Sequence, residues 1–377
     1  MKAHPLFSHL PQYERETSLS LKVRELSGEL PPAVLRLGLA YSNGDVTGSN
    51  ARCVAMLSAF HTVIREYEVP ANKILRDDVL QRLKPWVRFI TDCRPMSASM
   101  GNALRTLKLK ISKIHPQTAV SEAKAYLMDE IDSYIRERIT LAHQVIVAAA
   151  VERIADGDVV LTYATSYVIQ QVLLTAKQQG KEFQVVVVDS RPKHEGRRLL
   201  QALTGAGITC HYCLVSSLSS IMPSVTLVLL SAHSMLSNGA LISRCGTAIV
   251  AMVAHRRRIP VLVCCETYKF VSRVQLDAIC ANELGDPDEL LLAAGAMRAG
   301  GGESGGGSGS EVSGGGSGGV LSGWRDVAGL KLLNLVYDLT PVEFVTMVIT
   351  EVGNVPPTSV PVIVREYDKD GDAGDFD

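Results

Sequence analysis

The sequence lacks an excess of charge of either sign, and this absence narrows the classes of function. Its 377 residues carry a formal net charge of -1. A near-neutral chain has no electrostatic basis for non-specific binding to nucleic acid or to a membrane surface. No signal-peptide pattern opens the sequence, and no apolar run is long enough to span a bilayer. We therefore expect a cytoplasmic protein that contacts neither membranes nor nucleic acid directly.

Cysteine is too scattered to form a disulfide framework. The eight cysteines include one CxxC pair, Cys210 and Cys213, inside a strand-like run. Side chains three apart on a strand point to opposite faces, so this pair could not hold one metal ion. No second pair lies at zinc-ribbon spacing. The sequence therefore predicts buried thiols in a reduced protein and no metal site.

The common phosphate-binding loops are also missing. No GxxxxGK[ST] pattern occurs, and the glycines at 28, 38, 44 and 48 do not follow a strand. A dinucleotide fingerprint requires a preceding strand, so it fails on context. We expect no cofactor and no Walker-type nucleotide site.

The apolar pattern divides the chain into two domains. Residues 1–154 are typical of helices, with apolar side chains at spacings of three and four in 49–67 and 120–154. The second segment predicts one long amphipathic helix. Its apolar stripe comprises Leu127, Ile131, Ile135, Ile139, Ala142 and Ile146. Residues 1–154 are therefore predicted to form an all-helical domain.

The pattern changes after Asp156-Gly157, where short apolar runs alternate with helix-length segments or short loops. Buried strands that alternate with helices indicate a parallel sheet covered on both faces. We predict a Rossmann-like, doubly wound parallel-sheet domain over 155–377, with a disordered Gly/Ser insertion at 295–323 and an acidic tail at 366–377. The predicted strands are 159–163, 185–188, 208–214, 225–230, 248–253 and 261–265.

One charged loop lies where doubly wound sheets bind ligands, just beyond the carboxyl end of a predicted strand. This loop, Asp189–Arg198, carries four cations that could hold a phosphate. They are Arg191, Lys193, Arg197 and Arg198. The alternative is an ordinary loop at a helix start, in which Asp189 and Glu195 pair with those cations. The residues alone leave both interpretations open.

Several specific motifs follow one another through both predicted domains. They are His4–Leu10, Leu37–Tyr41, Gly48–Cys53, Cys93–Asn102, Asp189–Pro192, Asn282–Pro287, Tyr337–Pro341 and Ile349–Gly353. Together they resemble the alpha, beta and delta regulatory subunits of eukaryotic translation initiation factor 2B, and the delta type most. Delta-type members usually begin with a long basic extension, which is short or absent here and favours a truncated chain.

The same fold family contains sugar-phosphate isomerases, which use a cysteine and an aspartate after two strands. The resemblance places Ala164 at the cysteine position and His233 at the aspartate position. Alanine can neither donate nor accept a proton, so the resemblance implies a non-catalytic protein. The alternative is an isomerase-like protein or a metabolite-binding module with a vestigial phosphate pocket. That pocket would be formed by Arg191, Arg197 and Arg244.

The resemblance implies a regulatory function within an assembly. The expected partners are the alpha, beta, gamma and epsilon subunits of initiation factor 2B, of which epsilon catalyses guanine-nucleotide exchange. The regulatory subunits sense phosphorylation of the alpha subunit of initiation factor 2. A phosphoserine adds a charge near -2 that arginines can bind.

Two sets of residues are candidates for these contacts. Phosphorylated factor 2 alpha would bind the long helix at Glu137, Arg138 and Leu141, with Arg94 from the neighbouring motif. The alternative for the helix residues is a solvated flank. The subunit seam would hold Leu333, Leu335, Val336 and Phe344. For these four the alternative is an internal core, which periodicity does not exclude.

Overall fold

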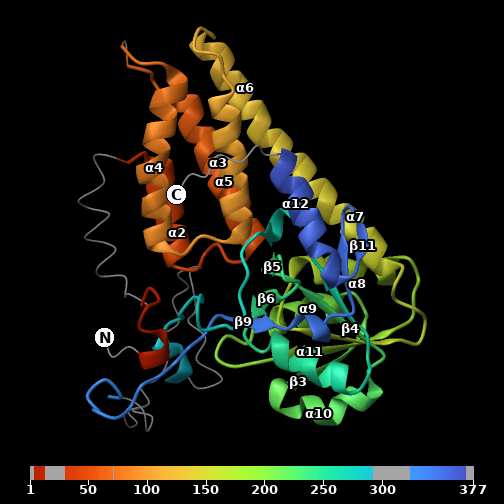
Figure 1. Ribbon diagram of the computed structural model, residues 1–377. Helices are drawn as coiled ribbons and strands as arrows, with labels where there is room; N and C mark the ends of the chain where they lie inside the picture. The colour runs from red at the N-terminus through yellow and green to blue at the C-terminus, as the bar shows by residue number, and fades with distance from the viewer. Residues whose placement is uncertain (1–3, 13–29, 71, 292–322, 371–377) are drawn as a thin grey trace, which may run out of the picture.

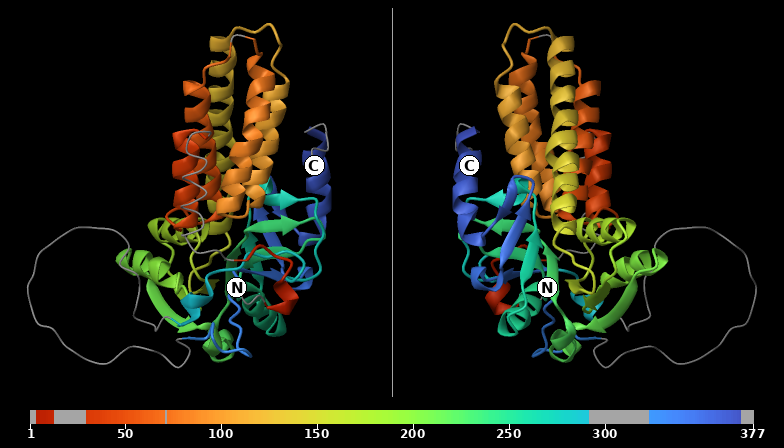
Figure 2. Two further views of the ribbon diagram at one scale, coloured as in Figure 1. Left: turned by 90° about the vertical axis from the view of Figure 1, so that its left-hand side faces the viewer. Right: turned by 90° about the vertical axis from the view of Figure 1, so that its right-hand side faces the viewer.

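The computed structural model describes residues 4–12, 30–70, 72–291 and 323–370. A helical bundle stands on an α/β domain, as Figures 1 and 2 show. The predicted order of domains and the predicted fold class are confirmed. The predicted Gly/Ser insertion, apart from Gly323, and the last seven residues of the predicted acidic tail lie outside the described residues.

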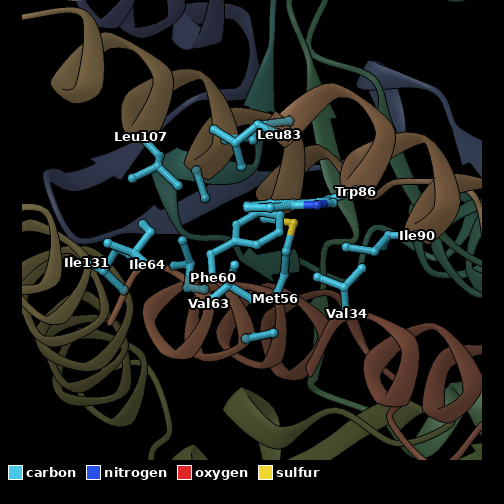
Figure 3. Packing of buried hydrophobic residues seen from close by; sticks show 14 of the residues in the cluster. Val34, Met56, Phe60, Val63, Ile64, Leu83, Trp86, Ile90, Leu107 and Ile131 are labelled. Carbon is cyan, nitrogen blue, oxygen red and sulfur yellow. The ribbon is translucent and has the colours of Figure 1, made fainter. Parts of the chain in front are cut away.

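The bundle is formed by helices that bury one apolar stripe each. Its helices are α2 (Pro32–Ser42), α3 (Ser49–Glu66), α4 (Leu75–Cys93), α5 (Ala98–Ser112) and α6 (Val120–Ser133). Figure 3 shows Phe60 and Trp86 packed at its centre, with ring centroids 6.4 Å apart. Gly48 precedes α3 at φ 91°, a backbone conformation that side chains disfavour. The Ser97 hydroxyl caps α5 by accepting a hydrogen bond from the N–H of Met100.

The predicted long helix exists and connects the two domains. It consists of α6, a π-helical segment η2 (Tyr134–Leu141) and α7 (Ala142–Val151). Leu127 and Ile139 pack in the core of the bundle, whereas Ile146 packs against the sheet. By packing, α7 therefore belongs to the α/β domain, although the boundary was expected at residue 154.

The main sheet has the order β11-β10-β7-β4-β1-β2-β3, and every neighbouring pair is parallel except β10 and β11. Apolar helices and loops cover both faces, and two separate apolar clusters result. Cys210 packs on one face and Cys213 on the other, as the strand period requires. The strands are β1 (Val159–Tyr163), β2 (Gln184–Asp189), β3 (Thr209–Leu214), β4 (Leu227–Ser231), β7 (Val261–Cys264), β10 (Met347–Thr350) and β11 (Gly353–Val355).

The helices of this domain follow individual strands. Tyr167–Gln178 forms α8, and Gly196–Gly205 forms α9 after the charged loop. The domain also contains α10 (Leu218–Ile221), α11 (Thr247–Arg256) and α12 (Val360–Asp370). The described residues contain no helix long and apolar enough to cross a membrane. The first five residues of the predicted acidic tail, 366–370, continue α12.

The strand predicted at 248–253 is wrong, because these residues lie in helix α11. Val250 and Ala254 are buried there, whereas Ile249 and Met252 are 46% and 48% exposed. That three-to-four spacing is helical, and a short apolar run does not reveal it without its neighbours. Gly246 precedes the helix at φ 111° and allows the sharp entry.

A second sheet of four strands was not predicted. Its order is β8-β5-β6-β9. In sequence, its strands come from segments that lie between strands of the main sheet. Its strands are only two to four residues long and give little periodicity. They are β5 (Ser234–Leu236), β6 (Leu241–Arg244), β8 (Phe270–Val271) and β9 (Tyr337–Thr340).

Candidate functional site at the domain junction

Two polar residues of the bundle motifs reach into the α/β domain. Asn50 Nδ2, at the start of α3, donates to Glu266 Oε1 at 2.7 Å. Glu266 also pairs with Lys269 at 2.6 Å, and this ion pair is almost fully buried. Arg94 Nε, just after α4, lies 2.8 Å from Glu283 Oε1, with side chains 12% and 14% exposed. Residues that carry the resemblance therefore form a joint between the two domains.

The carboxyl end of the sheet carries the two positions that the resemblance aligns with isomerase catalysis. Ala164 follows β1, is 5% exposed and has a φ of 56°. His233 follows β4, and its ring centroid lies 4.2 Å from that of Tyr337. Burial lowers the pKa of His233 well below its usual value, and the cations Arg52 and Lys269 lower it further. The methyl group of Ala164 and an imidazole tilted against Tyr337 differ from the cysteine and aspartate pair that the resemblance expects for isomerisation.

The three arginines of the expected phosphate pocket have separate partners. Arg244 Nη2 lies 2.8 Å from Glu195 Oε1, in a largely buried ion pair. Arg191 Nη2 donates to the carbonyl oxygen of Leu290 at 3.4 Å, and Arg197 hydrogen-bonds the Tyr212 hydroxyl. A small hollow of about 10 Å³ is lined by Tyr337, Ile242 and Gln275 among others, and none of the three arginines lines it. The Glu195 carboxylate of the loop therefore pairs with Arg244, which lies outside the loop, and Asp189 accepts a hydrogen bond from Tyr212.

The N-terminus of α11, a natural position for a phosphate, is already occupied by the protein itself. Asp338 Oδ2 accepts hydrogen bonds from the N–H groups of Gly246 at 2.6 Å and Ala248 at 2.9 Å. Burial raises the pKa of Asp338 to about 6, although these N–H groups favour the charged form. The Tyr163 hydroxyl donates to the carbonyl oxygen of Cys245 at 2.5 Å and fills the space beside Gly246. No room for a phosphate remains at this helix end.

The candidate partner residues of the long helix lie together on its exposed side. Glu137, Arg138 and Leu141 fall in the π-helical segment, and Leu141 is 46% exposed. Segments of π-helix are uncommon and often occur at functional sites. Val145, one turn further, is 48% exposed and extends the apolar side of this surface. Arg94 is instead enclosed in its ion pair at the joint.

The candidate interface residues divide into two groups. Val336 is 8% exposed, and Phe344 packs on the core of the main sheet. Leu333 and Leu335 are partly exposed, and Leu335 forms an isolated antiparallel bridge with Leu284. Val336 and Phe344 therefore pack in the interior of the domain, which was the alternative to an interface position.

Sequence reasoning missed a cluster of exposed apolar residues near this segment. Leu276 is 85% exposed, Val274 is 59% exposed and Ile279 is 39% exposed. His9 Nε2 lies 3.0 Å from the carbonyl oxygen of Ile279, which brings the N-terminal segment with its 58% exposed Leu6 to the same place. Isolated apolar residues in a loop give no periodic signal, so only the folded chain reveals them.

The structure is a helical bundle followed by a Rossmann-like α/β domain, and the two are joined by contacts such as the Arg94–Glu283 ion pair. Residues 45–357 match the sequence model of the Initiation factor 2 subunit family. The chain belongs to that family, as the ordered motifs indicated.

Curated relatives agree with this assignment. The chain is 43% identical over 362 residues to translation initiation factor eIF2B subunit delta of Schizosaccharomyces pombe, covering 96% of this chain and 73% of the relative. It is also 43% identical to the subunit of the same name from Dictyostelium discoideum, covering 97% of this chain but only 56% of the relative. The chain therefore spans about half to three quarters of the length of these two relatives.

A solved structure shares the whole arrangement. The tetrameric eIF2B-beta2-delta2 complex from C. thermophilum contains a chain with 32% identity and a TM-score of 0.76, matched over 92% of this chain and 97% of that one. A more distant relative is the ribose 1,5-bisphosphate isomerase of Thermococcus kodakarensis, 26% identical over 88% of this chain and 94% of that enzyme. The expected kinship with sugar-phosphate isomerases is thus confirmed.

Proposed function

We propose that this protein is a regulatory, non-catalytic subunit of the guanine-nucleotide exchange factor that acts on translation initiation factor 2 in the cytoplasm. The observation that carries the proposal is that groups expected to bind a phosphate are already paired within the protein. Arg244 is neutralised by Glu195 at 2.8 Å, and Asp338 occupies the end of α11 where a phosphate would bind. The identity to delta subunits over nearly the whole chain supports the regulatory role.

The beta-type subunit is the proposed direct partner. Leu333 and Leu335 are partly exposed apolar residues of the α/β domain, and Leu276 is 85% exposed in the same domain. Contiguous exposed apolar surface on a soluble protein usually marks an interface. Val336 and Phe344 pack inside the domain, and we propose that the alpha, gamma and epsilon subunits complete the assembly.

The surface on the long helix is the proposed contact for the alpha subunit of initiation factor 2. Leu141 and Val145 supply apolar area, and the flanking Glu137 and Arg138 supply charge. A phosphorylated partner changes the charge presented to these residues, so affinity changes with phosphorylation. Arg94 supports this surface indirectly, because it holds the domains together.

Co-expression with a beta-type subunit tests the assembly. We expect the two chains to elute as one stable complex in gel filtration. Leu333→Glu combined with Leu335→Glu should separate them, because each substitution places a charge in an apolar contact. Ile249→Glu, at an exposed apolar residue of α11, is the matched control. A chain that elutes alone in every case would refute the proposed assembly.

A further inference from the structure

The long helix gives the two domains one continuous connection, visible in Figure 1 as the rod from α6 to α7. Its first part packs in the bundle through Leu127 and Ile131, and its last part packs on the sheet through Ile146 and Ala150. The segment between them is π-helical, a rare interruption of an α-helix. A single rod with such a segment does not by itself fix the angle between two domains.

A second connection lies at the other side of the joint. The short helix η5 (Thr267–Lys269) follows β7 of the α/β domain, yet Tyr268 is 6% exposed and packs in the core of the bundle. Asn102 of α5 holds this inserted loop by two hydrogen bonds, and we call this contact the clamp. Its Nδ2 donates to the carbonyl oxygens of Tyr268 and Phe270, each at 2.9 Å. The side-chain amide thus uses both of its N–H bonds to hold one loop of the other domain.

The clamp is reinforced by charge on either side. Lys269 and Glu266 form a buried ion pair at 2.6 Å, and Asn50 donates to the same carboxylate. Removing one partner from a buried ion pair is costly, so this loop has little freedom to leave the bundle. The rod and the clamp together hold the bundle at two separate points.

We propose that Asn102 is a positioning residue, which fixes the bundle on the α/β domain and thereby sets the shape of the surface at Glu137 and Leu141. This inference rests on the proposed function for the identity of the partner. The clamp also continues into the second sheet, because Phe270 begins β8 and pairs in register with Met235 of β5. From there the order β8-β5-β6-β9 leads to the segment of Leu333 and Leu335. A continuous set of contacts therefore connects the two proposed binding surfaces.

Hydrogen exchange on the full chain tests the clamp directly. Asn102→Asp keeps the shape of the side chain but cannot donate, and it sets a carboxylate against two carbonyl oxygens. We expect amides of Tyr134–Leu141 to exchange at least about tenfold faster, because two hydrogen bonds that restrain the joint are lost. Amides of α3 and β1 should keep their protection. Gln81→Glu, the same chemical change at an exposed position of α4, is the matched control.

Two further variants keep the test decisive. Asn102→Ala removes both donors without adding charge, and it replaces Asn102→Asp if that variant does not fold. Tyr268→Phe retains the inserted ring and removes a hydroxyl that has no hydrogen-bond partner, so wild-type exchange is expected. Unchanged exchange of Tyr134–Leu141 in a folded Asn102 variant would overturn the proposal.

Binding to initiation factor 2 separates this inference from the proposed function. In a complex with the beta-type subunit, we expect Asn102→Asp to reduce the ratio of affinities for phosphorylated and unphosphorylated factor by about fivefold or more. A wild-type complex without any such ratio would refute the proposed function, while faster exchange would still support the clamp. A full ratio in the folded variant would overturn the positioning role.

Discussion

Arg94 of the helical bundle and Glu283 of the α/β domain form an ion pair across the domain joint, with 2.8 Å between Nε and Oε1. Burial lowers the pKa of Arg94, but the charge and hydrogen bond of Glu283, with the nearby Tyr337 and Glu195, together raise it overall. Arg94 therefore stays charged in a place with little water. The two residues are 189 positions apart, and they join the domains without a ligand.

Arg94→Ala should destabilise the protein by about 2–3 kcal/mol, because the carboxylate of Glu283 is left largely buried without its charged donor. The measurement is the shift of the urea unfolding midpoint. Arg88→Ala, at an exposed arginine of α4, is the control and should change little. Combining Arg94→Met with Glu283→Leu should recover part of the loss. Equal effects of Arg94→Ala and Arg88→Ala would show that the pair contributes nothing.

Restoring the two isomerase residues should not restore an enzyme. We expect Ala164→Cys combined with His233→Asp to leave ribose 1,5-bisphosphate unconverted in a coupled assay. The reason is that Glu195 already pairs with Arg244, and Asp338 already accepts hydrogen bonds at the helix end that would bind a phosphate. Turnover by the double variant would mean that the cleft opens to substrate.

Substitutions on the exposed helix surface should affect partner binding without affecting folding. Glu137→Lys and Leu141→Gln should each change the affinity for phosphorylated factor 2 by about fivefold or more, while the unfolding free energy stays within about 0.5 kcal/mol of wild type. Glu122→Lys, an exposed charge reversal at the start of α6, is the control. Binding can be followed by surface plasmon resonance on the assembled complex. If Glu137→Lys and Glu122→Lys behave alike, the surface lies elsewhere.

Asp338 should make stability depend on pH between about 4 and 6. Its folded pKa is raised to about 6 from the ordinary value of 3.8, so the folded protein binds a proton that the unfolded chain releases. The contribution of this proton is therefore fully present below pH 4 and is lost as pH rises through 6. Asp338→Asn should remove that component, which thermal unfolding at pH 4, 5, 6 and 7 measures. The same slope in both proteins would contradict the assigned pKa shift.

The sequence predicted the domain order and five of the six named strands. Long helices show a clear period, and buried strands form short apolar runs. It did not predict β8, which has two residues, or the helical nature of 248–253. At the site, the sequence named Arg94 and Arg244 as candidates but did not predict that they pair with Glu283 and Glu195. Glu283 lies 189 residues from Arg94, and such long-range pairing leaves no local pattern in one sequence.

The central claim is that this chain regulates an exchange factor by responding to the phosphorylation of its substrate. The most direct measurement is a pull-down of the complex with the beta-type subunit, using initiation factor 2 with and without phosphate on its alpha subunit. The regulatory account predicts a stable heteromer whose binding to factor 2 changes on phosphorylation. A chain that remains alone, treats both forms alike and converts a ribose phosphate would contradict it.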